Sequence, residues 1–585
     1  MSVTAERVQP QGQRTEWLYG RWPDLLIGCG LAYVLSIPLL FGLSEASGVS
    51  EWPVALMVGL ALLVNGPHYG ATIVRVYEAR EDRRKYFVFA VYLTLAVSVL
   101  FAASSRSLWL ASALLTVYAT WTPWHFSGQN YGLTLMFLHR RGIAVDPLTK
   151  RLVYASFVLS AGIAILAIHS GYKEFVFSPN TLQVANTPSL FALKPPAALA
   201  VPLRAAVVLA YLGCLGAAAW RLRQRARLRD LGPALLLVLS QALWFTVPAL
   251  LLHGRGALVF SAIWVNAAHS LQYLWVTAYY ARSSQAQDSA QRFLLKALVA
   301  GTAVATLPGL IMAPNLLGTV PWDVGLAATF FAVVNLHHFI LDGAIWKLRD
   351  GRVARVLLRG AAPLEHSALT PPPRGRPWLR RLVWTVAALS LVVPLAEIYG
   401  RLALSSAKRP EDTQLPTQIL KWVGRETVQM QYLIGASYSR ERKHDRAISH
   451  FLRSIELFPT GRVWTALGNE YRGLGQYGRA RAAFEAAIEL NPKVVTAHIG
   501  RAQALLKLSS ESEPRSRQEA VLSLERALEI SPGHSQAAVM LAQVYTDLGQ
   551  PDLAIRTLER ALEADKPADA EAVRRELAQI SGRRD

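Results

Sequence analysis

The sequence predicts an all-α protein in which a polytopic bundle of transmembrane helices is followed by a soluble solenoid of paired helices. Long apolar runs fill residues 24–400, as is typical of membrane-spanning helices. Residues 401–585 contain no such run and are rich in alanine, leucine, glutamate and arginine. A spacing of about 34 residues recurs in this polar part, as in arrays of repeated helix pairs. With 585 residues, of which 52% are hydrophobic and 17% charged, the chain is expected to hold more than one domain.

These observations divide the chain into four parts. Residues 1–24 form a polar N-terminal segment that lacks the short apolar stretch and cleavage site of a removable signal peptide. Residues 25–400 form the membrane domain, residues 401–427 a linker, and residues 428–585 the soluble repeat domain with a helix that caps its C-terminal end. The first span is therefore expected to act as its own insertion signal.

Runs of about 20 apolar residues predict about eleven spans. They lie near residues 25–44, 53–75, 86–104, 108–138, 151–169, 199–220, 231–252, 257–281, 293–313, 322–346 and 381–399. The fourth span is long enough to tilt, and Pro123 in its middle favours a kink.

The basic residues predict the orientation of these spans. Arginine and lysine gather in every second connection, for example in "RLRQRARLRD", whereas "GLSEASGVSEW" and "APNLLGTVPW" contain none. Because basic connections stay in the cytoplasm, we expect a cytoplasmic N-terminus and, with an odd number of spans, an extracytoplasmic repeat domain. The expected location is a bacterial inner membrane. The same placement explains the net charge of +21 and argues against a nucleic-acid partner.

The polar part resembles the tetratricopeptide repeat family over residues 428–567. The copy "WTALGNEYRGLGQYGRARAAFEAAIELNP" has the residues of that family at the expected spacings: Trp464, Leu467, Gly468, Tyr471, Ala480, Phe484, Ala487 and Pro492. Three further copies surround it, and "ADAEAVRRELAQI" is expected to be the capping helix. The resemblance implies a concave groove that binds a protein or peptide partner. The alternative is an array that only stiffens or oligomerises the protein.

Four histidines in the predicted spans share a pattern. They lie in the second, fourth, eighth and tenth spans, which all run from outside to inside: His68, His125, His269 and His338. Polar ionisable residues inside a membrane are costly and usually functional. Because the four lie at comparable depth on parallel helices, we expect their imidazoles to bind a metal ion in the bundle core. The alternative is four separate structural histidines.

Other polar residues on the same helix faces are expected to support this site. Each lies about one helical turn from a histidine, where an amide can hydrogen-bond the imidazole and fix its tautomer: Asn65, Asn266, Asn335, Gln129 and Gln272. Asp342 follows His338 by one turn, and His337 adds a fifth imidazole beside it. Asp342 and His337 are the candidate catalytic residues, which would complete the metal's ligand shell or relay protons.

Imidazole ligands suit iron, copper and zinc, and a single nearby carboxylate argues against a carboxylate-bridged iron pair. A transition metal is therefore expected, with iron favoured over copper or zinc. Haem held between paired histidines is the alternative, and glycines near His68 and His125 would give it room: Gly66, Gly70, Gly128 and Gly132.

The membrane domain resembles histidine-rich polytopic oxygenases and desaturases, including bacterial carotene-cleaving dioxygenases of the Brp/Blh type. The resemblance lies in histidines scattered over several spans and in the stretch "HHFILD"; the usual desaturase histidine boxes are absent. It implies a metal-dependent oxidoreductase that acts on a membrane lipid or another hydrophobic substrate. The alternative is a non-enzymatic scaffold, or a transport or assembly component of the cell envelope, that recruits partners through its repeats. A lipid-linked sugar transferase is a third hypothesis.

Overall fold

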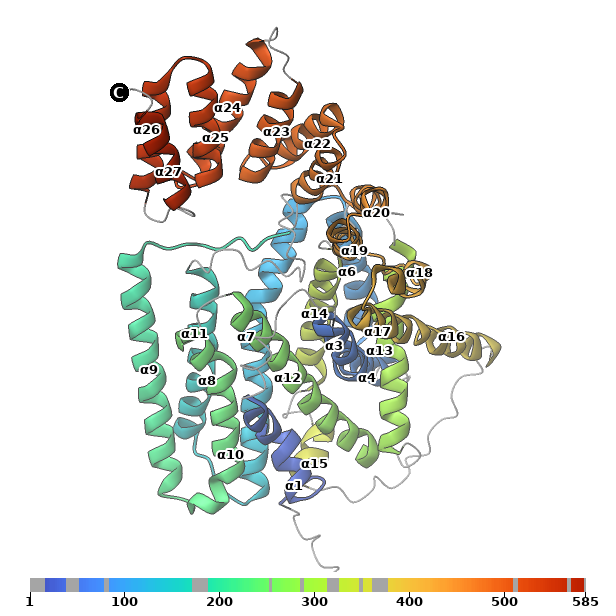
Figure 1. Ribbon diagram of the computed structural model, residues 1–585. Coiled ribbons are helices and arrows are strands. Elements are labelled where there is room, and N and C mark those ends of the chain that lie inside the picture. Colours follow the sequence, from blue (N-terminus) through green and yellow to red (C-terminus); the bar gives the residue numbers. More distant parts are fainter. Residues whose placement is uncertain are drawn as a thin grey trace, which may run out of the picture. The chain divides into compact units, whose positions relative to one another are not determined.

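The computed structural model describes residues 16–37, 52–77, 84–170, 188–251, 255–284, 289–312, 326–346, 351–359, 377–508, 514–564 and 570–582. Within these ranges every regular element is a helix (Figure 1). The chain divides into two compact units. One consists of Met1–Pro179, Pro188–Ser406 and Gln418–Gly424, and the other of Asn180–Thr187, Ala407–Thr417 and Arg425–Asp585.

The first unit is a bundle of helices with several short π-helical turns. Its helices are α1 (Arg21–Pro23), α3 (Trp52–Leu60), α4 (Gly66–Tyr77), α6 (Thr94–Ser104), α7 (Leu108–Arg140), α8 (Pro147–His169), α9 (Ala197–Arg223), α10 (Leu228–Gln241), α11 (Val247–Leu251), α12 (Arg255–Ser284), α13 (Ala290–Met312), α14 (Leu326–Ile345), α15 (Gly351–Arg359), α16 (Pro377–Leu389) and α17 (Val392–Ser406). The π-helical turns are η1 (Asp24–Gly28), η2 (Ala61–Asn65), η3 (Val88–Leu93) and η4 (Ala242–Thr246).

Seven helical stretches in the described residues are long and apolar enough to cross a membrane. They are Ala55–Tyr77, Pro147–His169, Ala197–Arg223, Leu228–Leu251, Ala290–Leu310, Leu326–Ile345 and Trp378–Ser406, and each matches a predicted span. The predicted span 86–104 corresponds to the shorter apolar helix Val88–Ser104. The predicted spans 108–138 and 257–281 are the helices α7 and α12, which are long but not among the seven. Length and composition thus support a smaller number of spans than about eleven.

The first predicted span, 25–44, is not one continuous helix where it is described. Gly30 has a φ of +83°, a conformation that interrupts a helix and that glycine adopts readily. Just before it, the buried Asp24 accepts hydrogen bonds from two backbone N–H groups and from the indole of Trp275 on α12, at 3.1 Å. Residues 1–15 of the predicted N-terminal segment and 38–44 of this span lie outside the described residues.

Two of the π-helical turns lie directly before prolines. The turn η2 ends two residues before Pro67, and η4 ends two residues before Pro248. Proline donates no backbone hydrogen bond, so the helix before it readily widens into a π turn. Pro123 behaves differently, because α7 continues through it as one helix. The kink that Pro123 favours therefore does not break α7.

Small residues bring α4 and α13 into backbone contact. A Cβ atom on Gly70 would collide with the carbonyl oxygen of Ala297, and one on Gly301 with the carbonyl oxygen of Gly66. Close crossings of this kind are typical of helix pairs in membranes. The contact holds the segment of α4 that carries His68.

The predicted linker, 401–427, is largely helical. The helix α17 extends to Ser406, a 3₁₀ turn η6 spans Pro410–Thr413, and α18 spans Gln414–Trp422. Within the first unit, the side chain of Leu420 lies directly against Gly400 of α17.

From Val428 on, the described residues of the second unit form four helix pairs and one final helix. The pairs are α19 (Val428–Arg440) with α20 (His444–Leu457), α21 (Gly461–Gly473) with α22 (Tyr477–Leu490), α23 (Val495–Leu508) with α24 (Pro514–Ile530), and α25 (Ser535–Asp547) with α26 (Pro551–Glu563). The final helix, α27 (Ala570–Ser581), covers α25 and α26 and buries Val573 and Ile580.

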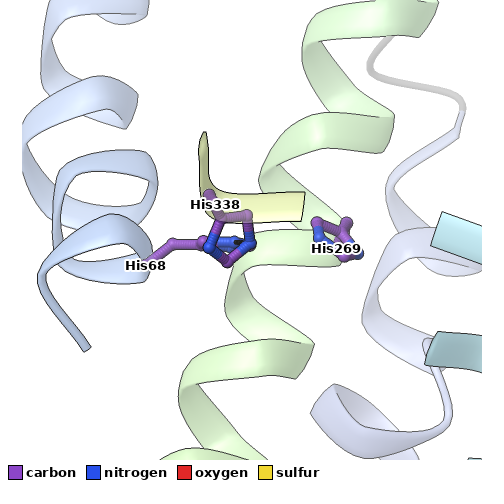
Figure 2. Close-up of side chains that lie close together, drawn as sticks. All are labelled: His68, His269 and His338. Carbon is purple, nitrogen blue, oxygen red and sulfur yellow. Dashed lines mark hydrogen bonds between the residues drawn. The ribbon is translucent and has the colours of Figure 1, made fainter. Parts of the chain in front are cut away.

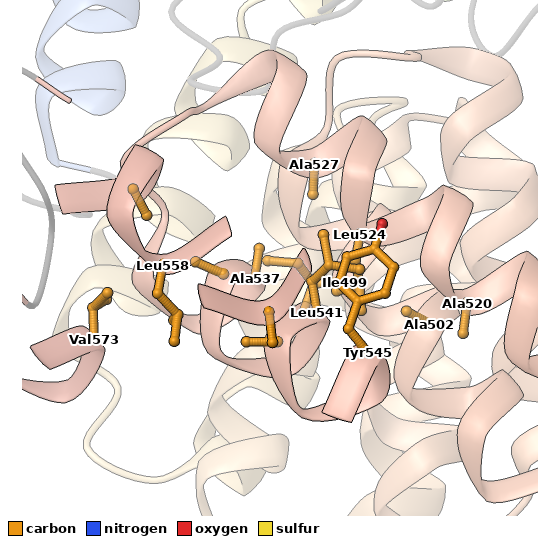
Figure 3. Packing of buried hydrophobic residues seen from close by; sticks show 14 of the residues in the cluster. Ile499, Ala502, Ala520, Leu524, Ala527, Ala537, Leu541, Tyr545, Leu558 and Val573 are labelled. Atoms are coloured by element: carbon orange, nitrogen blue, oxygen red, sulfur yellow. The ribbon is translucent and has the colours of Figure 1, made fainter. Parts of the chain in front are cut away.

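Glycines and alanines let the helices of each pair pack closely. A Cβ atom on Gly468 would lie 2.7 Å from the ring of Phe484, and one on Gly435 would lie equally close to the ring of Phe451. The C-terminal pairs share one continuous core in which small and large apolar residues alternate (Figure 3). The equivalent residues of the first two copies lie 33 residues apart, as Gly435 and Gly468 do, one fewer than predicted. Ala502 follows Gly468 by the predicted 34 residues, whereas Ala520 follows Ala480 by 40 because the third copy carries an insert.

Candidate metal centre

Four histidines from four helices meet inside the first unit. His68 comes from α4, His125 from α7, His269 from α12 and His338 from α14. The ring centroids of neighbouring pairs are 4.2 Å apart for His68 and His338, 5.0 Å for His68 and His269, and 5.4 Å for His125 with either His269 or His338. Figure 2 shows the imidazoles of His68 and His338 pointing toward one another, with His269 beside them. His68, His269 and His338 are buried, and His125 is partly buried.

The ligand atoms of these side chains fall into two overlapping groups. Nitrogens of His68, His269 and His338 all lie within 4.8 Å of one another, and so do ligand atoms of His125, His338 and Asp342. His338 belongs to both groups: its Nε2 is 2.5 Å from Nε2 of His68 and 3.3 Å from Oδ2 of Asp342. Because Nε2 of His338 is close both to His68 and to Asp342, the two groups belong to a single small site.

Several ring nitrogens of this site are buried without a hydrogen-bond partner. They are Nδ1 of His68, Nε2 of His125 and both ring nitrogens of His269. Buried polar atoms in proteins are nearly always paired, and an unpaired one costs about 1–3 kcal/mol. The arrangement therefore offers free lone pairs that a cation could use.

A hydrogen-bonded group of four side chains adjoins His338. The Thr72 hydroxyl lies 3.0 Å from Nδ1 of His338, 2.7 Å from the Tyr273 hydroxyl and 3.3 Å from Oδ1 of Asp342. The Tyr273 hydroxyl donates to Oδ1 of Asp342 at 2.8 Å and accepts from the indole N–H of Trp346 at 3.0 Å. Asp342 therefore has both oxygens engaged, with Oδ1 held by hydroxyls and Oδ2 facing His338.

Arg75 lies beside this group, against Trp346. Its guanidinium lies over the rings of Trp346, at 3.8 Å, and Tyr280, at 4.2 Å, and donates to the carbonyl oxygen of Ile345. A cation held between two aromatic faces gains attraction from both rings. Its positive charge also acts on the carboxylate of Asp342.

The predicted supporting amides make other bonds. Gln129 donates to the side chain of Gln272 at 2.5 Å and to the backbone carbonyl of His269 at 3.3 Å, while Gln272 donates to the carbonyl of Gly28. Gln129 thus links α7 to the backbone of α12, and Gln272 links α12 to the backbone of η1; neither of these bonds goes to an imidazole. Asn335 donates to the carbonyl of Phe331 on its own helix.

The other two predicted supporting amides are Asn65 and Asn266. Oδ1 of Asn65, in the turn η2, is buried without a partner. Asn266 is partly buried one turn before His269 on α12. The hydroxyl of Thr72 thus occupies the position beside an imidazole that was expected for an amide.

His337 lies outside the cluster. Its Nε2 is 2.8 Å from the hydroxyl of Thr94 on α6, and that hydroxyl is 3.0 Å from the hydroxyl of Tyr77. Adjacent residues of a helix point about 100° apart, which explains why His337 and His338 enter different surroundings. Of the two candidate catalytic residues, only Asp342 adjoins the four histidines.

The sequence interpretation did not single out Arg75, Trp346 or three of the aromatic rings that lie against the imidazoles, namely Tyr69, Phe126 and Phe339. Arg75 and Trp346 reach the site through contacts between helices that are far apart in the chain, and a single sequence carries no sign of those contacts. The rings had a local signal: an aromatic residue directly follows His68, His125 and His338, in "HY" once and in "HF" twice.

Comparisons with known proteins bear on the second unit. Residues 465–535 and 516–580 match family models described as tetratricopeptide repeat. No curated protein matches the chain.

Several solved structures are similar to part of the chain. YrrB, described as a tetratricopeptide protein with an unusual peptide-binding site, is 18% identical, with 32% of this chain and 91% of that chain covered and a TM-score of 0.26. TTC0263 of Thermus thermophilus is 20% identical, with 27% and 83% covered and a TM-score of 0.24. The first repeat domain of Spaghetti (RPAP3), bound to an HSP90 peptide, is 22% identical, with 21% and 94% covered and a TM-score of 0.20. Together with the paired helices of the second unit, the family matches identify residues 465–580 as tetratricopeptide repeats.

Proposed function

We propose that this chain is an integral membrane oxidoreductase that binds one transition-metal ion through His68, His125, His269 and His338 and acts on a hydrophobic, lipid-like substrate. We further propose that its tetratricopeptide repeats bind a protein or peptide partner. The observation that carries the metal proposal is the meeting of four imidazoles with unpaired buried nitrogens.

A cation would explain the closest contact in the cluster. Two neutral imidazoles whose Nε2 atoms are 2.5 Å apart repel one another unless a proton or a metal ion lies between their lone pairs. A proton can serve only one such pair, whereas a metal ion also serves His125 and His269. The Thr72 hydroxyl beside Nδ1 of His338 favours the tautomer that leaves Nε2 free as a ligand.

The donor set favours iron among the transition metals. Imidazole nitrogens suit iron, copper and zinc, and a neighbouring carboxylate oxygen is a harder ligand that copper(I) would disfavour. Bound iron would supply redox chemistry, and Asp342 would hold or release a proton beside it. We favour a single ion over haem because ring centroids 4.2–5.4 Å apart leave no slot for a macrocycle. The close packing of Gly66 and Gly70 against α13 removes space that haem would need.

The surroundings of His125 and His269 are apolar and aromatic. The neighbouring cluster contains Phe126, Trp244, Phe245 and Phe339, with Trp121 and Tyr118 packed against it. Aromatic and apolar surroundings of this kind favour a hydrophobic substrate over a sugar or a nucleotide. The aromatic setting is the basis for the proposed substrate class.

The exposed apolar surface supports a location in the bilayer. Only 6% of the apolar stretch of α9 is buried inside the structure. The side chains of Leu209 and Trp220 on this helix are 70% and 63% exposed. Apolar surface of that extent is unfavourable in water and favourable in lipid. We propose a cytoplasmic N-terminus and an extracytoplasmic repeat domain from the distribution of basic residues.

Cysteine labelling tests this orientation. Cys29 and Cys214 are replaced by serine, and a single cysteine is introduced by Lys493→Cys in the repeat domain or by Arg223→Cys at the last residue of α9; both positions are exposed. We expect a membrane-impermeant maleimide to label the Lys493→Cys protein in intact cells and the Arg223→Cys protein only after lysis. The reverse pattern would overturn the proposed orientation.

Metal analysis of the purified protein in detergent tests the proposed activity class. We expect close to one iron per chain, lost in His269→Ala and retained in His169→Ala. His169 is the matched control because it hydrogen-bonds Thr120 near the end of α8, away from the cluster. A metal-free wild-type protein would overturn the enzyme proposal and favour the scaffold hypothesis, in which the repeats recruit partners to the membrane.

A further inference from the structure

We infer that Tyr69, Phe126, Tyr273 and Phe339 are positioning residues that fix the planes of the four imidazoles, each acting across a helix contact. The inference rests on the proposed metal site and deepens it, because it names the side chains that orient the ligands.

Each of these rings lies against a histidine of another helix. Phe126 of α7 stacks on His269 of α12, with centroids 3.7 Å apart and planes inclined by 15°. Phe339 of α14 stacks on His125 of α7 at 4.1 Å and 22°.

The other two rings complete the set. Tyr273 of α12 stacks on His68 of α4 at 4.4 Å and 17°. Tyr69 of α4 meets His338 of α14 edge-on, at 5.7 Å and 73°. Stacked and edge-to-face arrangements are the favoured geometries of ring pairs and stabilise them beyond the burial of apolar area.

The four contacts form a closed cycle. A ring on α12 orients the histidine of α4, and a ring on α7 orients the histidine of α12. A ring on α14 orients the histidine of α7, and a ring on α4 orients the histidine of α14. A shift of any one of these helices would therefore disturb both its own ligand and the ligand of a neighbour. Such mutual support is what a preorganised metal site needs.

His269 depends most strongly on its ring partner. The torsion that turns an imidazole about its Cβ–Cγ bond is broad and only weakly restricted by the backbone. Hydrogen bonds usually restrict it, but both ring nitrogens of His269 lack a partner. Phe126 on one face, with Trp244 edge-on at 6.4 Å, thus sets the plane of this imidazole.

The substitution Phe126→Leu tests the inference, with Phe137→Leu as its matched control. Both phenylalanines are on α7 and buried, but Phe137 stacks on Trp275 and contacts Trp17 rather than one of the four histidines of the site. The probe is Co²⁺ added to metal-depleted full-length protein in detergent, followed by its visible absorption, which reports ligand geometry. Thermal unfolding of each variant is measured in parallel.

We expect Phe126→Leu to weaken Co²⁺ binding about 10- to 100-fold and to change the absorption band, as loss of a ligand-orienting partner does. Phe137→Leu should lower thermal stability to a similar extent while keeping the wild-type affinity and band. Phe126→Tyr, which keeps the stacked ring, should restore both.

The outcomes separate this inference from the proposed function. If Phe126→Leu binds Co²⁺ with wild-type affinity and an unchanged band, the positioning role is wrong and the metal site stands. If Phe137→Leu loses binding as strongly as Phe126→Leu, the effect is general destabilisation and the inference is again wrong. If the wild-type protein binds no Co²⁺ and contains no metal, both proposals fail.

Discussion

The Thr72 hydroxyl on α4 lies 3.0 Å from Nδ1 of His338 on α14, and Nε2 of that imidazole faces the cluster. In the tautomer that leaves Nε2 free to bind a metal, the hydroxyl accepts the N–H of Nδ1. The isosteric substitution Thr72→Val would leave that N–H without a partner. We expect about 10- to 100-fold weaker metal binding, measured by titration of metal-depleted protein.

Thr277→Val is the control for this substitution. Thr277 is also buried on a helix of the site, but its hydroxyl donates to the carbonyls of Tyr273 and Leu274 in its own helix. Its replacement should leave metal affinity unchanged. Equal losses in the two variants would show that the Thr72 hydroxyl has no specific role.

The backbone contact of α4 with α13 makes a second prediction. Gly70→Ala would place a Cβ atom against the carbonyl of Ala297 and force the helices apart. Because His68 lies one half-turn away, we expect lower metal occupancy and lower thermal stability. Gly59→Ala, inside a helix where a Cβ atom meets open space, should leave metal occupancy unchanged and should not lower thermal stability. Wild-type occupancy in Gly70→Ala, by metal analysis, would contradict this account of the crossing.

Turn glycines in the repeats make a third prediction. Gly475 has a φ of +73°, which costs an alanine about 1–2 kcal/mol. Gly475→Ala should therefore lower the local free energy of unfolding of α21 and α22 by that amount, measured by hydrogen exchange of the full chain. Gly478→Ala, inside α22 with open space around it, should raise it by about 0.5–1 kcal/mol. If Gly475→Ala left the local free energy of unfolding unchanged, the turn would have relaxed to a negative φ.

The repeat domain should lose stability as the pH falls below about 6.5, the ordinary pKa of histidine. Burial lowers the pKa of His450, whose Nδ1 lies 2.7 Å from Oε1 of Gln431 and whose ring stacks on Tyr438. A folded pKa below the unfolded one means that the unfolded chain takes up the proton first, so protonation favours unfolding. The stabilisation that neutral His450 contributes to the repeat domain is complete above the unfolded pKa and is lost as the pH falls below it.

The substitution His450→Gln tests this pH dependence. Glutamine keeps a donor for Gln431 but does not titrate, so the midpoint of the repeat domain's thermal transition should fall less between pH 7 and pH 5 than in the wild type. If the midpoint fell equally in the two proteins, the acid sensitivity would come from groups other than His450.

The repeats were predictable because their determinants are local. Gly468 and Phe484 stand at fixed spacings, and their contact follows from the pairing of adjacent helices. The extent of the pairs could be read from the same residues. The helical structure of the linker was not predictable, since α18 is only nine residues long, too short for the sequence pattern alone to indicate a helix.

The site was predictable only in part. The shared direction of their predicted spans indicated that His68, His125, His269 and His338 could meet. Which side chains support them depends on contacts across helices far apart in the sequence. Thr72 and Tyr273 adjoin His338 and Asp342 because α4, α12 and α14 cross there, whereas Asn335 bonds to its own helix.

X-ray absorption of the metal-loaded protein tests the central claim most directly. Imidazole rings bound to a metal give characteristic outer-shell scattering, so the number of histidine ligands can be counted. The proposed site predicts one metal environment with nitrogen and oxygen ligands near 2.0–2.2 Å and scattering from about four imidazoles. A bound metal without imidazole scattering, or with sulfur ligands, would contradict it.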